Sequence, residues 1–126
     1  MKYLLIFILV ILTGCNQQVN EISSMEAQKL IEEEEVIVLD VRSVDEYNQG
    51  HIENAINIPY EEIDDKIDNI IMYKNKKILL YCRTHNRSRI ALETLKKHDF
   101  KNIYLMYEGY SEYEICCNRW LSSIFL

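Results

Sequence analysis

A chain of 126 residues has the usual size of one domain, and with one proline and three glycines it contains no segment typical of a linker or an internal repeat. Its 20 acidic residues outnumber its 14 lysines and arginines, which gives a formal net charge of −6. Because such a surface repels phosphate backbones, we expect no nucleic acid among its partners.

The first residues have the pattern of an export signal. Lys2 precedes an apolar run over residues 4–12 that is too short to span a bilayer. Residues 12–15, Leu-Thr-Gly-Cys, resemble the lipobox of bacterial lipoproteins, in which a peptidase cuts before a cysteine that carries a diacylglycerol. We therefore expect a lipoprotein signal peptide over residues 1–14, lipid on Cys15, a tether over residues 15–20 and a folded domain over residues 21–126.

This leader predicts an exported protein that lipid anchors to the outer face of a bacterial membrane, on the periplasmic or cell-surface side. An uncleaved apolar anchor and an ordinary signal peptide are the alternatives.

Two capping boxes, each a serine followed three residues later by a glutamate, predict helix starts at Ser23 and Ser43. The first helix has an apolar stripe through residue 33. Between the two starts, residues 36–39 form a continuous apolar run that is too short for a helix. Such a run predicts a strand buried on both faces, as in a parallel sheet.

The second half of the chain repeats the alternation. In order, it predicts a short strand at residues 55–58, a helix over residues 61–72, a strand at residues 77–81, a helix over residues 88–97 and a strand at residues 102–106. Alternating strands and helices predict an α/β fold, in which a mostly parallel central sheet carries helices on both faces.

The strand at residues 77–81 runs into a polar loop that continues directly into a helix. Cys82 opens this loop, at the carboxyl end of the sheet where parallel folds bind ligands. Arg83, Arg87 and the positive end of the helix all favour the thiolate of Cys82 over its thiol. Asp40 and Arg42 lie on a shared face at the end of the strand predicted at residues 36–39, on the same edge as the loop, so we expect them to pair and support the loop.

The mature part of the chain resembles a rhodanese domain over residues 22–113. The resemblance is carried by Leu39-Asp40-Val41-Arg42, Glu46-Tyr47, Gly50-His51-Ile52, Ala55, Asn57-Ile58-Pro59, Cys82-Arg83-Thr84 and Arg87-Ser88. It implies a rhodanese-like three-layer sandwich and transfer of sulfane sulfur. Cys82 would take sulfur from a small donor such as thiosulfate or a persulfide and pass it to cyanide or a thiol, including a thiol on a partner protein.

The resemblance also implies the surroundings of the sulfur. The persulfide on Cys82 would lie in a cradle formed by Arg83, Thr84, His85, Asn86, Arg87 and Ser88, with no metal and no organic cofactor. Arg87 follows Cys82 by five positions, one fewer than in rhodanese-like phosphatases, which favours a sulfur atom over a phosphoryl group.

Two positions depart from the family pattern. His85 stands where glycine is most frequent, and a positive φ there would make its β-carbon costly. Near the end of the domain, one glycine, Gly109, and Tyr113 stand in place of two glycines and a tryptophan. We expect Tyr113 to pack near the active-site loop rather than act as a catalytic acid.

The cysteines leave two other functions open. With Cys15 on lipid, Cys82, Cys116 and Cys117 form an odd set, and a disulfide between the neighbours Cys116 and Cys117 would be strained. The chain could be a thiol redox protein in which Cys82 works with Cys116 or Cys117. The other alternative is a rhodanese-fold module that binds a partner without catalysis.

Overall fold

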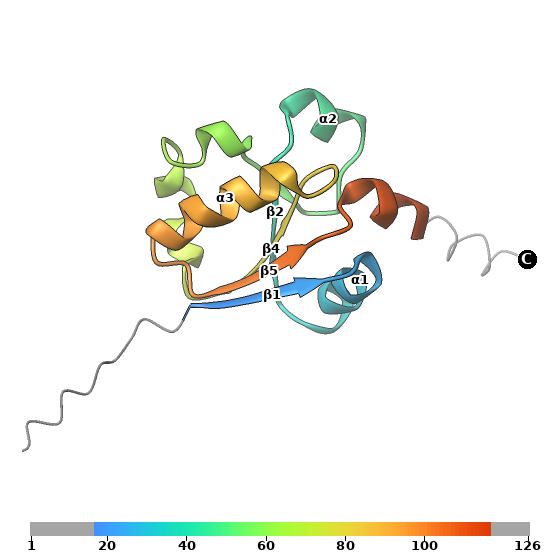
Figure 1. The fold of residues 1–126 in the computed structure, drawn as a ribbon, viewed down its shortest axis with the longest axis horizontal. Helices are drawn as coiled ribbons and strands as arrows, with labels where there is room; N and C mark the ends of the chain where they lie inside the picture. The colour runs from blue at the N-terminus through green and yellow to red at the C-terminus, as the bar shows by residue number, and fades with distance from the viewer. Residues whose placement is uncertain (1–16, 117–126) are drawn as a thin grey trace, which may run out of the picture.

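A sheet of five parallel strands forms the centre of the domain, in the order β1-β5-β4-β2-β3 (Figure 1). The computed structural model describes residues 17–116. The strands are β1 (Gln18–Ile22), β2 (Ile37–Asp40), β3 (Ile56–Asn57), β4 (Lys77–Tyr81) and β5 (Asn102–Met106). Every pairing between them is parallel, so the sheet that we expected to be mostly parallel is entirely so in the described residues.

The edge strand β1 differs from the sequence-based expectation. Residues 18–20, which we assigned to a polar tether, lie within β1, and this strand pairs with β5 from Gln18 opposite Asn102 to Ile22 opposite Met106. An edge strand has one side without a neighbouring strand, and the side chains of β1 are only partly buried or exposed. Its sequence therefore lacks the continuous apolar run by which the central strands were predicted.

Two of the helices begin at the predicted start signals. The helices α1 (Ser24–Glu33) and α2 (Val44–Gln49) each follow a capping serine, Ser23 and Ser43. In both, the serine hydroxyl accepts a hydrogen bond from the backbone N–H of the glutamate three positions later, and the carboxylate of that glutamate accepts one from the serine N–H. Both capping boxes are therefore confirmed. The helix α3 (Asn86–Lys97) begins two residues before its predicted start. Residues 110–116 are also helical.

The helix predicted over residues 61–72 is wrong. Three short 3-10 turns replace it, at Tyr60–Glu62, Ile67–Asn69 and Ile71–Tyr73. Residues 61–72 contain four isoleucines and three aspartates, which have lower helix propensity than alanine or leucine. The turns still bury Ile63 and Ile70 in the core, so tertiary packing satisfies the apolar pattern without a regular helix.

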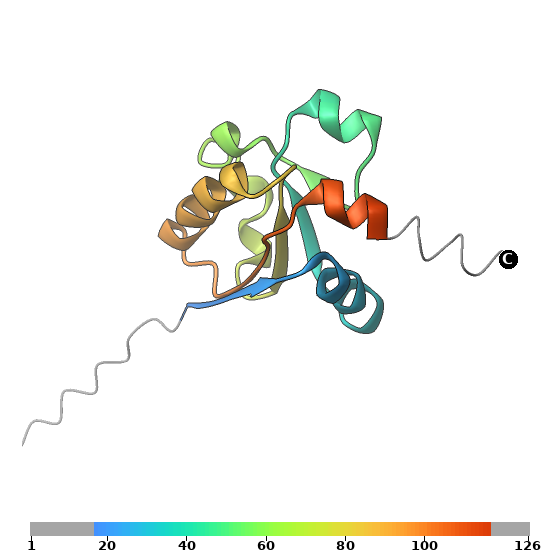
Figure 2. The same ribbon diagram turned by 45° about the vertical axis from the view of Figure 1, so that its right-hand side comes forward.

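The two faces of the sheet bury alternate residues of each strand. Ile78, Leu80 and Cys82 pack on the face covered by α3, and Leu79 and Tyr81 pack on the face covered by α1 (Figures 1 and 2). The cysteine thus shares a layer with α3. No helix within residues 17–116 is long and apolar enough to cross a membrane.

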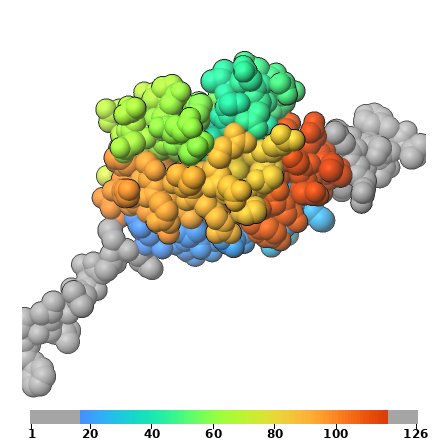
Figure 3. All heavy atoms as spheres, turned by 45° about the horizontal axis from the view of Figure 1, so that its top comes forward, coloured from blue at the N-terminus to red at the C-terminus, as the bar shows by residue number. Residues whose placement is uncertain are grey.

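The loop between β4 and α3 reaches the surface between two other segments. The space-filling view places it beside α2 and beside the helix over residues 110–116 (Figure 3). Segments that are far apart in the sequence therefore meet at the carboxyl edge of the sheet.

Candidate active site

Cys82 is the first residue after β4, and its side chain is buried. Only 1% of the residue is exposed. Its Sγ lies 3.5 Å from Oγ of Ser88, in the first turn of α3, and the Ser88 hydroxyl donates to the His85 carbonyl at 2.9 Å. The start of α3 thus closes over the thiol, and its first N–H groups, which have no partner within the helix, are directed toward this loop.

The other predicted cradle residues differ in exposure. Arg83, Thr84, His85 and Asn86 have exposed side chains, whereas Arg87 is half-buried and Ser88 is buried with the sulfur. Among the described residues, Ser88 is the one predicted cradle residue whose side chain forms a hydrogen bond with Cys82 Sγ.

The φ of His85 is −164°, so this residue does not have the positive φ that would make its β-carbon costly.

Arg87 is held by a carboxylate from α2. Its Nη1 and Nη2 donate to Oε2 and Oε1 of Glu46 at 2.6 and 2.8 Å, in a bidentate pair. The same carboxylate accepts from the backbone N–H of Ser43 at 3.1 Å. These bonds, the one from Arg87 foremost, lower the pKa of Glu46 to about 2. Glu46 thereby joins the start of α2 to the start of α3.

From the sequence alone, Glu46 was predicted to act only as a capping residue. Its partner Arg87 is 41 positions away, and no local pattern connects the two. The presence of Glu46-Tyr47 in the rhodanese resemblance was the one signal for a further role.

The pH dependence of stability tests the pair between Glu46 and Arg87. Since folding lowers the pKa of Glu46 from 4.5 to about 2, the stabilisation is fully present above pH 4.5 and is lost as the pH falls through about 2. We expect the difference in free energy of unfolding between wild type and Glu46→Gln to shrink over that range, as measured by urea titrations at successive pH values. The exposed Glu33, replaced by glutamine, is the control, and a Glu46→Gln difference independent of pH would contradict the pairing.

Asp40 and Arg42 form the expected ion pair, and both are buried. Nε of Arg42 lies 3.0 Å from Oδ1 of Asp40, and Nη2 lies 2.7 Å from Oδ2. The same Nη2 donates to the carbonyl oxygen of Gly50 at 2.6 Å, and the guanidinium carbon lies 4.1 Å from the ring centre of Tyr110. Burial opposes the charge on Arg42, but Asp40 outweighs it, so the pKa of Arg42 is raised.

Tyr81 completes this buried network. Its hydroxyl donates to Oδ2 of Asp40 at 2.6 Å and accepts from the N–H of Ile52 at 3.1 Å. Burial, assisted by Asp40, raises the pKa of Tyr81 well above its ordinary value, so the phenol remains a donor. The network connects the ends of β2 and β4 beneath the Cys82 loop.

The turn after β5 lies directly against the Cys82 loop. Gly109 has a φ of +80°, and a β-carbon there would come within 2.3 Å of the Arg83 carbonyl oxygen. The next N–H group, from Tyr110, donates to the Cys82 carbonyl at 2.8 Å. Tyr113 is partly buried in the core on the α1 face and stacks with Tyr110, as its predicted packing role requires.

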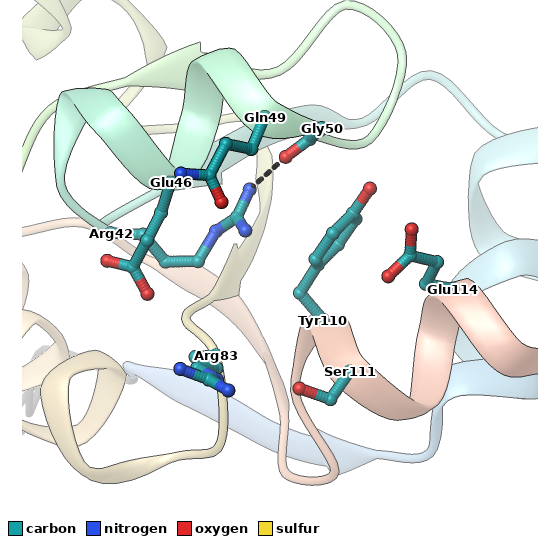
Figure 4. Close-up of a pocket in the computed structure, with 8 residues that line it drawn as sticks. All are labelled: Arg42, Glu46, Gln49, Gly50, Arg83, Tyr110, Ser111 and Glu114. Atoms are coloured by element: carbon teal, nitrogen blue, oxygen red, sulfur yellow. Dashed lines mark hydrogen bonds between the residues drawn. The ribbon is translucent and has the colours of Figure 1, made fainter.

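A polar groove of about 280 Å³ opens beside the loop (Figure 4). Arg42, Arg83 and the end of α2, with Glu46, Gln49 and Gly50, form part of its lining. The helix over residues 110–116 contributes Tyr110, Ser111 and Glu114. The groove was not predictable from the sequence, because its walls come from segments that only the fold brings together.

Cys116 lies away from this groove. It borders a separate hollow lined by the α1 residues Met25, Gln28, Lys29 and Glu32, and its thiol is free, like that of Cys82. Cys117 and Cys15 lie outside the described residues. Within residues 17–116, no three histidine, cysteine or acidic side chains form a group that could hold a metal ion.

Comparison with known proteins gives a consistent family match. The profile of the rhodanese-like domain family matches residues 23–116. Thiosulfate sulfurtransferase GlpE of Coxiella burnetii is 29% identical over 97 residues, which are 75% of this chain and 86% of that protein. A putative sulfur carrier protein of Bacillus subtilis, YrkF, is 33% identical over 88 residues, or 68% of this chain.

The match covers only 46% of YrkF and 31% of a tRNA uridine(34) hydroxylase from Buchnera aphidicola, so the chain spans less than half the length of these relatives. Among solved structures, a rhodanese-related protein from Thermoplasma volcanium has a TM-score of 0.64 at 30% identity, with 75% of this chain and 89% of that chain covered. A rhodanese-like domain protein from Staphylococcus aureus has a TM-score of 0.67 at 25% identity, with 75% and 90% covered.

Proposed function

Because this chain belongs to the rhodanese-like domain family and carries a cysteine at the turn from β4 into α3, we propose that it is a sulfurtransferase that carries sulfane sulfur on Cys82. The position of Cys82 is the observation that carries the proposal. Its Sγ lies next to the first turn of a helix, where unpaired N–H groups and the helix dipole favour an anion. The name of the relative GlpE, thiosulfate sulfurtransferase, supports the reaction class.

The reaction consists of two displacements on sulfur. The Cys82 thiolate attacks the outer sulfur of a donor such as thiosulfate, a new S–S bond forms, and sulfite leaves with the electron pair of the broken S–S bond. An acceptor, cyanide or a thiolate, then attacks the outer sulfur of the Cys82 persulfide. The S–S bond to Cys82 breaks, the product leaves as thiocyanate or a new persulfide, and the Cys82 thiolate is restored. Electrons balance without an added oxidant.

In this proposal, the hydroxyl of Ser88 stabilises the anionic sulfur on Cys82. Its hydroxyl donates to the His85 carbonyl while Cys82 is a thiol. When the sulfur is anionic, the hydroxyl can rotate and donate to it across the 3.5 Å that separates the two atoms. The persulfide would thus receive a side-chain donor in addition to the backbone of the loop.

Mass spectrometry of the folded domain tests the proposal. After incubation with thiosulfate or polysulfide, we expect a gain of one sulfur atom on Cys82, no gain in Cys82→Ser, and an unchanged gain in the control Cys116→Ser. A folded protein that gains no sulfur from any donor would instead favour the non-catalytic binding module. A loss of two hydrogens that requires Cys82 together with Cys116 or Cys117 would favour the thiol redox protein.

We further propose that the protein is exported and anchored by a lipid on Cys15. The lipobox-like pattern of residues 12–15 supports this proposal. Since β1 begins at Gln18, three positions after Cys15, the anchor would hold the domain close to the membrane surface. The intact mass of the full chain from a membrane fraction tests it. Loss of residues 1–14 with addition of a diacylglycerol is expected, and Cys15→Ser should retain the leader and lack the lipid.

A further inference from the structure

The groove beside the Cys82 loop contains two charged groups of opposite sign that have no partner among residues 17–116. Arg42 pairs with Asp40, and Glu46 pairs with Arg87. Arg83 and Glu114 are the other charged residues in its lining, and both are exposed. Neither of their side chains forms an ion pair or hydrogen bond with any residue between 17 and 116. These two charges are therefore available to a ligand.

The groove borders the backbone of the loop that begins at Cys82, the residue that would carry sulfur. Arg83 follows Cys82 in the chain, and Tyr110, which lines the groove, donates its N–H to the Cys82 carbonyl at 2.8 Å. The N–H of Ser111 donates to the Arg83 carbonyl at 3.4 Å. In the close-up, Arg83 and the helix that carries Ser111 and Glu114 lie on different walls of the same hollow (Figure 4). A molecule bound there lies beside the loop.

The charges of the groove do not suit a small inorganic dianion. Two arginines and two glutamates line it, so its formal charge is zero, and such an anion gains little net attraction. Its volume of about 280 Å³ approaches the lower limit of the pockets that hold organic ligands, roughly 300 Å³. The arrangement suits an organic molecule with one anionic and one cationic group.

We propose, on the premise that Cys82 carries sulfur as above, that the groove binds the sulfur acceptor and that this acceptor is a low-molecular-weight thiol of the amino-acid type. Its carboxylate pairs with Arg83, and its ammonium group pairs with Glu114. The thiol loses its proton to solvent, and its thiolate attacks the outer sulfur of the Cys82 persulfide. A new S–S bond forms, the bond to Cys82 breaks, and the Cys82 thiolate leaves with the electron pair.

Discharge of the persulfide by matched thiols tests this assignment. The protein is first loaded with polysulfide, and the rate of sulfur loss is measured with cysteine, 3-mercaptopropionate, cysteamine and 2-mercaptoethanol, each corrected for its thiolate fraction. We expect cysteine to react at least about fivefold faster than 2-mercaptoethanol, since an exposed ion pair can contribute about that factor. Equal corrected rates for all four thiols would overturn the proposal.

Two variants test the contributions of Arg83 and Glu114 separately. Arg83→Gln should reduce the ratio of the cysteine rate to the cysteamine rate, because these thiols differ by the carboxylate. Glu114→Gln should reduce the ratio of the cysteine rate to the 3-mercaptopropionate rate, because these differ by the ammonium group. Each ratio should fall about fivefold, and using ratios cancels any general effect on the loop. Ratios that neither variant changes would overturn the assignment.

The chain offers a matched control for each variant. Glu112 is exposed on the same helix as Glu114 but does not line the groove, and Arg89 is exposed on α3 and pairs with Glu21. Glu112→Gln and Arg89→Gln should leave both ratios unchanged. A protein thiol that discharges the persulfide at a rate unaffected by Arg83→Gln and Glu114→Gln would point to a different acceptor and contradict the proposal.

Ligand binding to a variant that cannot transfer sulfur tests the groove independently of the proposed function. In Cys82→Ser, which cannot carry sulfur, S-methylcysteine should shift the amide NMR signals of residues 46–50 and 110–114, and Arg83→Gln or Glu114→Gln should weaken its binding about fivefold. Binding together with no sulfur uptake by the wild-type protein would refute the transfer activity and support the groove. Sulfur uptake without this binding would refute the groove alone.

Discussion

Replacing Asp40 with alanine should destabilise the domain by about 3 to 5 kcal/mol, because it leaves the Arg42 guanidinium buried without its counter-ion. Arg42 is only 4% exposed, and Asp40 supplies both oxygens of its ion pair. The change also removes the acceptor of the Tyr81 hydroxyl. Urea unfolding at neutral pH measures the effect as a lower midpoint.

Two other variants show whether burial of the unpaired Arg42 charge causes this loss of stability. Glu35 pairs with Lys76 at the surface and is 81% exposed, so Glu35→Ala should cost less than about 1 kcal/mol. The double variant Asp40→Leu with Arg42→Met removes both charges and should be more stable than Asp40→Ala alone. An Asp40→Ala protein within about 1 kcal/mol of wild type would contradict the account, since a buried unpaired charge costs more.

Replacing Gly109 with alanine should displace the Cys82 loop and reduce both stability and sulfur uptake. The new β-carbon would lie 2.3 Å from the Arg83 carbonyl oxygen and 2.4 Å from that of Thr84, and backbone atoms cannot move aside singly. The φ of +80° adds the cost of a left-handed conformation for a residue with a side chain. We expect a loss of at least about 2 kcal/mol in urea unfolding. Uptake of polysulfide sulfur, followed by mass, should slow at least tenfold.

Gly50 provides the matched control for this change. A β-carbon at Gly50 would meet the Tyr110 hydroxyl at 2.9 Å, but that hydroxyl is the end of a side chain and can shift. Gly50→Ala should therefore cost less than about 1 kcal/mol, as small side-chain adjustments do. If the two variants behave alike, the contact between Gly109 and the loop does not position Cys82.

The sequence predicted secondary structure correctly where a single local pattern specifies the element. The strands β4 and β5 have the predicted bounds because each is a short continuous apolar run buried on both faces. The starts of α1 and α2 were predicted because a capping box is a contact between residues three positions apart. The pairing of Asp40 with Arg42 was predictable for the same reason, since the two residues are only two positions apart at the end of β2.

Prediction was wrong or incomplete where packing overrides local preference. The isoleucine spacing after Pro59 predicted a helix, but three 3-10 turns form instead. Ile63 and Ile70 are still buried in the core, and Ile67 and Ile71 pack against it partly buried. The polar sequence of β1 gave no strand signal, because an edge strand obtains its stability from hydrogen bonds to β5 rather than from burial on both faces.

The sequence by itself determined the alternating α/β order, the place of Cys82 between a buried strand and a helix, and the resemblance to the rhodanese domain. Each of these depends on residues that are close in the chain or on a pattern read in order. Only the tertiary structure decided the partners of the loop. It joined Arg87 to Glu46 across 41 positions and placed Gly109 and the helix after it against Cys82. Such contacts depend on which strands are neighbours, and the order β1-β5-β4-β2-β3 is a property of the whole sheet.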